Sequence, residues 1–174
     1  MIRRAMSWLC LIVFLGSVIS CSTTYTNIPP QAGDIAGHNV NSNPVCHVSI
    51  EAIQATLREQ PIDRAYAIIL PNNTNALTYA TVLSALGDLA SRDTDHSLPI
   101  IEIRQIRIRG NKAEVDLLRP TNVNDLASPR QLVTVYLHWA LMANWYPRNL
   151  HTWLAPHDRL LPDTTQIAMP SVTP

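Results

Sequence analysis

Length, composition and charge limit what this chain can be. Its 174 residues are enough for one domain and a short leader, and 13 Lys+Arg balance 13 Asp+Glu. Loss of Arg3 and Arg4 with a leader leaves 11 basic residues against 13 acidic ones, a net charge of about −2. This balance predicts no binding to nucleic acid.

The first 20 residues have the three parts of a secretory signal peptide. A basic start with Arg3 and Arg4 precedes an apolar core from Trp8 to Leu15, and two small residues follow. A transmembrane helix needs about 20 apolar residues, whereas the run from Trp8 to Ile19 has 12. The sequence therefore predicts a signal peptide over residues 1–20.

The stretch Val18-Ile19-Ser20-Cys21 resembles the lipobox of bacterial lipoproteins, in which an aliphatic, a variable and a small residue precede an invariant cysteine. It departs from the commonest pattern, which has leucine in place of Val18 and alanine or glycine in place of Ser20. The resemblance implies a lipid on the Cys21 thiol and cleavage just before it. Ser22, instead of aspartate, implies the outer membrane with a periplasm-facing anchor, or the cell membrane if the organism has no outer membrane. An ordinary leader would instead leave a soluble protein with a free thiol.

A polar, turn-rich segment follows Cys21. From Ser22 to Pro44 the chain reads STTYTNIPPQAGDIAGHNVNSNP, which has no apolar period and cannot bury enough surface to offset the entropy of ordering. We expect residues 21–44 to be a lipidated cysteine and a flexible tether with a reach of about 25 Å. The tail over residues 155–174 contains four prolines and is predicted to be irregular.

The folded domain is predicted to span residues 45–154 and to begin with helix, strand and helix. Ser49 is a suitable N-cap for a first helix that ends before Pro61, with an apolar stripe of Ile50, Ile53 and Leu57. Ala65 to Leu70 is a short apolar run typical of a buried strand. Asn75 can cap a second helix, whose apolar face comprises Tyr79, Val82, Leu83, Leu86, Leu89 and Ala90.

Residues 100–119 predict a β-hairpin around the two-residue turn Gly110-Asn111. Pairing outward from this turn sets Ile108 opposite Ala113, Arg107 opposite Glu114 and Ile106 opposite Val115. The alternation of apolar residues then breaks. One extra residue restores it, because Arg104 and Gln105 can both oppose Asp116, which places Ile103 opposite Leu117. The sequence therefore predicts a β-bulge at this point.

Residues 128–146 fit two structures. Ser128 to Gln131 form a helix capping box, whereas the residues that follow alternate as in a strand: Val133, Val135, Leu137 and Trp139 against Thr134, Tyr136 and His138. We favour the strand, because a helix would leave Val133, Leu137 and Leu141 on its outer face. Trp139 is then expected in the core. A last strand from Trp145 to Trp153 would pair with it at an edge, since it contains Pro147.

These elements predict an α+β domain, with two helices packed on a curved, mostly antiparallel sheet of four to five strands. Their order and the bulged strand resemble the cone-shaped folds of the cystatin and nuclear-transport-factor-2 type. The strand, turn and helix from Ala65 to Ala90 are also similar to part of the periplasmic domains of ExbD-type proteins, but this chain continues into two further hairpins.

No catalytic or metal site and no cofactor is predicted. Cys46 and His47 are adjacent, so their side chains usually point apart, and Cys46 is interpreted as a small buried residue or as one half of an intermolecular disulfide. Any of His138, His151 and His157 could reach Cys46 only through folding. His151 and His157 lack the spacing of metal ligands, and the turn at Asp93, Asp95 and His96 more often links two elements than holds a cation.

Three arginines on or beside the polar face of the first hairpin strand, Arg104, Arg107 and Arg109, could contact a lipid phosphate or a glycan carboxylate. A paired, solvated face is the favoured interpretation, because carboxylates lie close enough to neutralise them, namely Glu102, Glu114 and Asp116. The aromatic residues of the last two strands can form a ligand cleft, an interface or part of the core; they are Tyr136, Trp139, Trp145, Tyr146 and Trp153.

Two functions remain open. The favoured one is a non-enzymatic lipoprotein that binds an envelope protein or glycan, or supports envelope assembly, with membrane lipid held through Cys21. The alternative is an enzyme or small-ligand carrier that uses a concave sheet pocket, with His138 or His151 beside a carboxylate.

Overall fold

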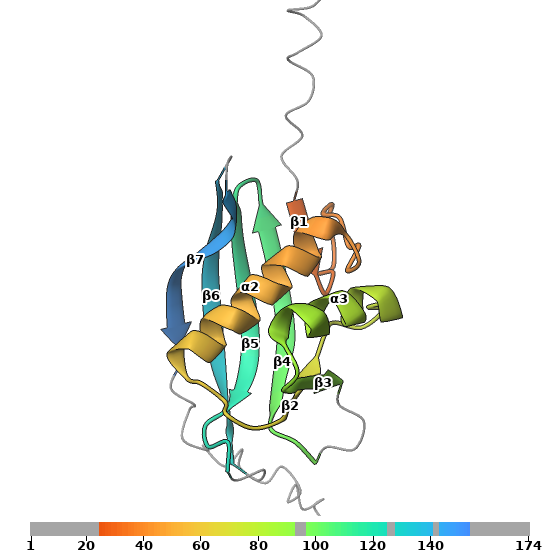
Figure 1. Ribbon diagram of the computed structural model, residues 1–174. Coiled ribbons are helices and arrows are strands. Elements are labelled where there is room, and N and C mark those ends of the chain that lie inside the picture. Colours follow the sequence, from red (N-terminus) through yellow and green to blue (C-terminus); the bar gives the residue numbers. More distant parts are fainter. Residues whose placement is uncertain (1–24, 93–96, 125–127, 141–142, 154–174) are drawn as a thin grey trace, which may run out of the picture.

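The computed structural model describes residues 25–92, 97–124, 128–140 and 143–153. The predicted signal peptide, Cys21 and the predicted tail at 155–174 lie outside these residues. The described chain is α+β, as predicted (Figure 1). Its elements are β1 (Tyr25–Ile28), α2 (Asn43–Glu59), β2 (Tyr66–Ile69), α3 (Ala76–Leu86), β3 (Ala90–Arg92), β4 (Ile100–Arg109), β5 (Lys112–Pro120), β6 (Arg130–Ala140) and β7 (Ala143–Thr152).

All seven strands belong to one mostly antiparallel sheet. The strand order is β3-β2-β4-β5-β6-β7, and β1 pairs with β4 beside this path. The predicted number of four to five strands is therefore too low, because β1 and β3 are short and lack an alternating pattern. Pairing of β2 with β3 and with β4 is parallel, whereas β4 to β7 form an antiparallel meander.

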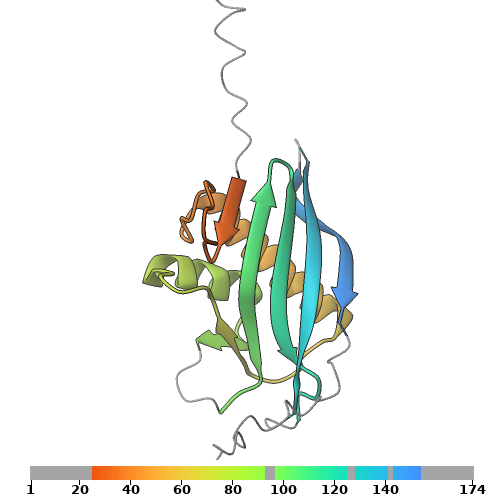
Figure 2. The same cartoon turned by 180° about the vertical axis from the view of Figure 1, so that it is seen from behind.

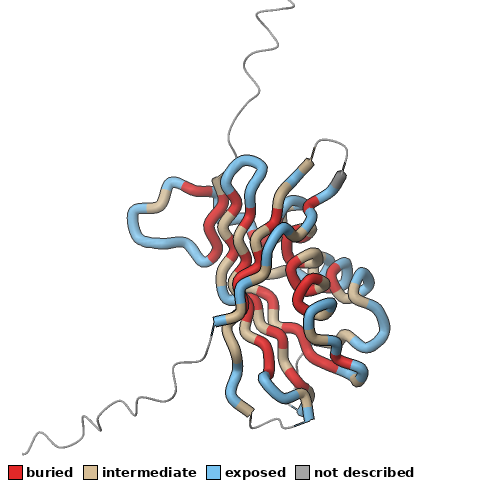
Figure 3. Tube along the Cα trace, turned by 90° about the vertical axis from the view of Figure 1, so that its left-hand side faces the viewer, coloured by how far each residue is buried: buried red, intermediate tan, exposed pale blue. Residues whose placement is uncertain are grey.

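Both helices lie on the same side of the sheet, and α2 crosses β4 to β7 diagonally (Figure 1). Buried positions follow the strands and the side of α2 that faces them (Figure 3). This core includes fully buried aliphatic side chains from α2, β4, β5 and β6, among them Ile53, Ile106, Val115, Leu117, Val133 and Val135. The helices thus fill one face of the sheet and leave the other open (Figure 2).

The expected tether is wrong from Tyr25 onward. β1 pairs antiparallel with the end of β4, so that Tyr25 is opposite Arg109 and Ile28 is opposite Ile106. Gly37 lies beside β1 in an isolated parallel bridge with Thr26 and donates its N–H to the carbonyl of Tyr25 at 2.8 Å. Thr26, Asn27 and Ile28 are buried, although the segment that contains them is polar. Backbone pairing with a strand some 80 residues away, which composition does not reveal, holds this segment in the domain.

The first helix begins earlier than predicted. α2 starts at Asn43, with Ser42 as its N-cap and Pro44 in the first turn, where proline is tolerated. Ser49, expected as the N-cap, is instead buried within the helix and donates its Oγ–H to the carbonyl of Val45 at 2.8 Å. The Cys46-His47 pair therefore lies in the first turns of α2 and not at the end of a tether.

Most other predicted elements are confirmed. β2 lies within Ala65 to Leu70, and the Asn75 side chain accepts the N–H of Thr78 at 2.7 Å as the cap of α3. α3 ends at Leu86, so Leu89 and Ala90 do not share its face as expected. The strand interpretation of residues 128–146 is confirmed by β6, and β7 forms the expected edge partner.

The hairpin has the predicted register and the predicted bulge. Arg107 is opposite Glu114, Gln105 is opposite Asp116, and the register shifts between Ile103 and Gln105. Gly110 has a φ of 58°, which the first position of a type II′ turn requires.

Candidate functional site

The open face of the sheet carries its side chains in rows across the strands. Directly paired residues point to the same face, so the register alone defines each row. The row at the start of β1, called the terminal row below, is Tyr25, Arg109, Lys112, His138 and Tyr146. The second row is Asn27, Arg107, Glu114, Tyr136 and Asn149, and the third contains Gln105, Asp116, Thr134 and His151.

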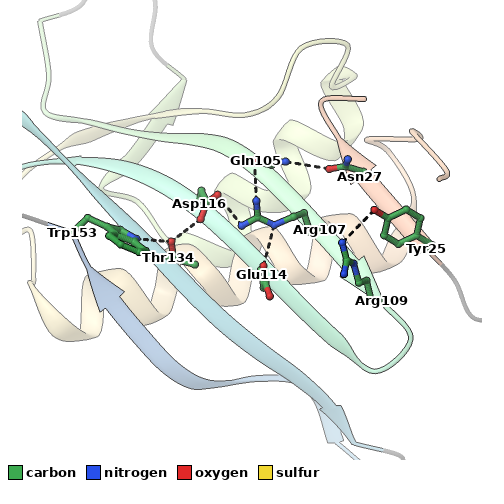
Figure 4. A network of polar contacts seen from close by, with 9 residues as sticks. All are labelled: Tyr25, Asn27, Gln105, Arg107, Arg109, Glu114, Asp116, Thr134 and Trp153. Carbon is green, nitrogen blue, oxygen red and sulfur yellow. Dashed lines mark hydrogen bonds and ion pairs between the residues drawn. The ribbon is translucent and has the colours of Figure 1, made fainter. Parts of the chain in front are cut away.

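Arg107 is the centre of a polar network on the open face (Figure 4). Its guanidinium donates to Glu114 and Asp116 at 3.0 Å each and to the Oε1 of Gln105 at 3.0 Å. Asp116 also accepts the hydroxyl of Thr134 at 2.7 Å, and Thr134 accepts the indole N–H of Trp153 at 2.9 Å. The network therefore connects side chains from β4, β5 and β6 with Trp153, which follows β7.

The predicted pairing of the arginines is confirmed for two of the three. Arg107 lies between the carboxylates of Glu114 and Asp116. Arg104 forms a salt bridge with Glu102 at 2.6 Å, and Glu102 also pairs with Arg130 at 2.6 Å. Arg109 differs. Its guanidinium lies 5.2 Å from the ring centre of Tyr25, and it has no salt bridge to any residue in the described part of the chain.

His138 and His151, which folding could have brought near Cys46, lie on the other side of the sheet from it. Cys46 is a buried free thiol in α2, and its burial raises the pKa of the thiol, which favours the unreactive form. His138 and His151 lie on the open face, in the terminal and third rows, on the opposite side of the sheet from α2. His157, Asp93, Asp95 and His96 lie outside the described residues. Among those described, no group of three or more His, Cys, Asp or Glu is placed to hold a metal ion.

The three tryptophans of the last strands have different surroundings. Trp145 is buried in the core, whereas Trp139 and Trp153 are 43% and 47% exposed. The expectation that Trp139 belongs to the core is therefore wrong. Trp139 continues the apolar side of β6, but it is the second-last residue of this strand. α2 does not cross the end of β6 (Figure 1).

A cavity that sequence reasoning missed lies at the edge of β4. β1 pairs with residues 106–109 of this strand and β2 with residues 100–102, which leaves a gap at the bulge between them. The cavity has a volume of about 520 Å³, with an apolar base that includes Ile28, Val40, Leu70 and Ile103 and a rim of His38, Asn72, Glu102 and Arg104. His38 donates its Nδ1–H to the carbonyl of Asn27 at 2.9 Å, which fixes the ring at the rim.

No protein-family model, no curated protein and no solved structure matches this chain. None of the helices that the structure describes is long and apolar enough to cross a bilayer.

Proposed function

We propose that this chain is a lipoprotein whose domain is a non-enzymatic module for binding an envelope protein or glycan, or for supporting envelope assembly. A lipid on Cys21 holds it in the outer membrane, facing the periplasm, or in the cell membrane where there is no outer membrane.

The open face of the sheet is the observation that carries this proposal. A face with aromatic and charged side chains that are already fixed by hydrogen bonds loses little side-chain entropy when a partner binds. Tyr136 and Trp153 are the type of residue that dominates protein interfaces, and the Arg107 network supplies donors and acceptors between them. The resemblance of the Cys21 segment to a lipobox supports the membrane location.

Intact mass and membrane fractionation of the native protein and a Cys21→Ala variant test the proposal. The wild type should carry the mass of a lipid on a chain that begins at Cys21, and should sediment with outer membranes. The Cys21→Ala variant should not be processed in this way. If both proteins are cleaved and soluble, Cys21 is not a lipid anchor and the proposed location is wrong.

A small-ligand carrier or enzyme is a second candidate, which the cavity beside the β4 bulge favours. Its apolar base and polar rim have the composition of a small-molecule site. Native mass spectrometry of the purified protein would support this candidate if a small molecule is bound to the wild type and absent from a Val40→Trp variant, whose larger side chain fills the cavity. A protein without any bound molecule would favour the binding module.

A further inference from the structure

We propose that the end of the sheet beside Tyr25 is a membrane-contact surface that lies against anionic lipid headgroups. It consists of the terminal row and Trp139. This inference rests on the proposed lipid on Cys21, because that lipid brings the surface to the bilayer.

The distance between the anchor and the fold is the first argument. β1 begins at Tyr25, so only residues 22–24 separate it from Cys21. Four Cα–Cα steps span at most about 14 Å. The headgroup layer on one side of a bilayer is itself about 5 to 7 Å thick. The end of the sheet where β1 starts is therefore held within or just above the headgroups, and cannot stand off by the 25 Å that a long tether would allow.

The β4–β5 turn lies at the same end of the sheet as the start of β1 (Figure 1). Tyr25 is opposite Arg109, which leads into the β4–β5 turn. Asn111 in that turn accepts the backbone N–H of Trp139 at 2.8 Å, so β6 ends beside it. The start of β1, the β4–β5 turn and the end of β6 thus form one edge of the molecule.

The charge of this edge suits anionic lipid. Arg109 and Lys112 are exposed and adjacent in the terminal row, which contains no carboxylate. Within the described residues neither of them is in a salt bridge. Glu114, which follows Lys112 on the same face of β5, is in the second row and is bonded to Arg107. The two cations are therefore available to lipid phosphates, as basic residues next to a membrane anchor are.

The aromatic residues of this edge suit the same environment. Tyr146 and Trp139 are 38% and 43% exposed, and the ring of Tyr146 lies 6.3 Å from that of His138. Tyrosine and tryptophan prefer the membrane–water interface, because the ring is apolar and its O–H or N–H stays hydrated. Aromatic and cationic side chains together thus fit a headgroup layer better than bulk water.

Quenching of tryptophan fluorescence by lipid tests this surface, and the chain offers a matched control. Trp139 and Trp153 have nearly equal exposure, but Trp153 pairs near Leu132, about 23 Å from Trp139 along β6. Trp145 is directly opposite Trp139, so a Trp145→Phe form of the mature lipoprotein serves as the parent protein. The parent protein and its Trp139→Phe and Trp153→Phe variants are reconstituted in vesicles of phosphatidylethanolamine and phosphatidylglycerol. Some vesicles also contain a lipid with a nitroxide on its headgroup. We expect the nitroxide to quench the parent protein and its Trp153→Phe variant, whereas the Trp139→Phe variant loses most of the quenching.

Unchanged quenching in the Trp139→Phe variant would overturn the proposal, as would loss of quenching in the Trp153→Phe variant. A third outcome is that the nitroxide lipid does not quench the emission, while quenching by acrylamide decreases as the protein concentration rises. This outcome would overturn the proposal and would indicate that a second copy of the protein covers this surface. Intact mass is measured on the same samples. Absence of the lipid mass would reject the proposed anchor, whereas lipidated protein without Trp139 quenching would reject this surface alone.

Charge reversal tests the cations separately. An Arg109→Glu, Lys112→Glu double variant should show weaker quenching of Trp139 on the anionic vesicles. An Arg58→Glu, Arg130→Glu double variant makes the same change in net charge at exposed positions in the last turn of α2 and the first position of β6, and should match the parent protein. Equal quenching in the two double variants would overturn the assignment of Arg109 and Lys112 to phosphate contact.

Discussion

Arg119 links the end of α2 to the sheet. It is the only buried charged side chain among the described residues, and its Nη1 donates to Glu59 at 2.7 Å. Its Nη2 lies 3.4 Å from the side-chain oxygens of both Gln131 and Thr152, whereas its Nε has no partner. A cation at this place also interacts favourably with the carbonyl end of the helix.

We expect Arg119→Ala to lower the free energy of unfolding by about 2 to 3 kcal/mol, because it removes buried aliphatic contacts as well as the pair with Glu59. Arg104→Ala is the matched control, since Arg104 pairs with Glu102 but is 57% exposed. Its loss should be about 0.5 kcal/mol or less. Urea unfolding of both variants measures the difference, and equal losses would mean that burial adds nothing to the Arg119 pair.

Cys46 predicts how stability depends on pH. Burial raises the pKa of this thiol above its ordinary value of 9.0, so the folded protein holds the thiol proton more tightly than the unfolded chain. The resulting stabilisation is complete below the unfolded pKa and is lost as the pH rises toward the folded pKa. Tyr66, whose pKa burial also raises, adds to the loss at higher pH.

The free energy of unfolding should therefore fall as the pH rises above about 8, and it should fall less steeply in a Cys46→Ala variant. Urea unfolding at several pH values gives both slopes. The variant removes buried atoms, so only the slopes are compared and not the absolute stabilities. Identical slopes would show that the thiol does not contribute to the alkaline loss.

At the scale of elements, the bulge in β4 keeps two apolar patterns in register. Ile106 and Ile108 face the helices on one side of it, and Ile101 and Ile103 face them on the other. This feature could be predicted from the sequence, because the alternation of both strands is visible and the turn fixes where pairing starts. β1 could not be predicted, since four residues without an apolar period give no sign of a partner near residue 106.

Deletion of Arg104 should be far more damaging than its substitution. Without the extra residue, Ile101 and Ile103 would turn to the open face, and each fully buried isoleucine is worth about 1.5 to 3 kcal/mol. We expect the deletion variant to lose about 3 to 6 kcal/mol, or not to unfold cooperatively, whereas Arg104→Ala remains close to the wild type. Circular dichroism during urea unfolding compares the two. A deletion variant as stable as Arg104→Ala would show that pairing does not depend on the bulge.

At the scale of the whole molecule, patterns of single elements indicated the α+β class but not how β1 and β2 share the edge of β4. That sharing creates the cavity at the bulge, which requires residues from three distant segments and has no local signal. The exposure of Trp139 was also not predictable, because an alternating strand shows which face a residue occupies but not how far along the strand a helix covers it. The resemblance to cystatin and nuclear-transport-factor-2 folds stays a prediction.

The pairing of β1 with β4 has a mechanical consequence. A force that pulls Tyr25 along the axis of β1 acts at right angles to the hydrogen bonds to β4. The hydrogen bonds between β1 and β4 are therefore loaded in shear at the same time, and they do not break one after another. Load that enters through Tyr25 is therefore shared between the hydrogen bonds of β1 to β4 and those to Gly37.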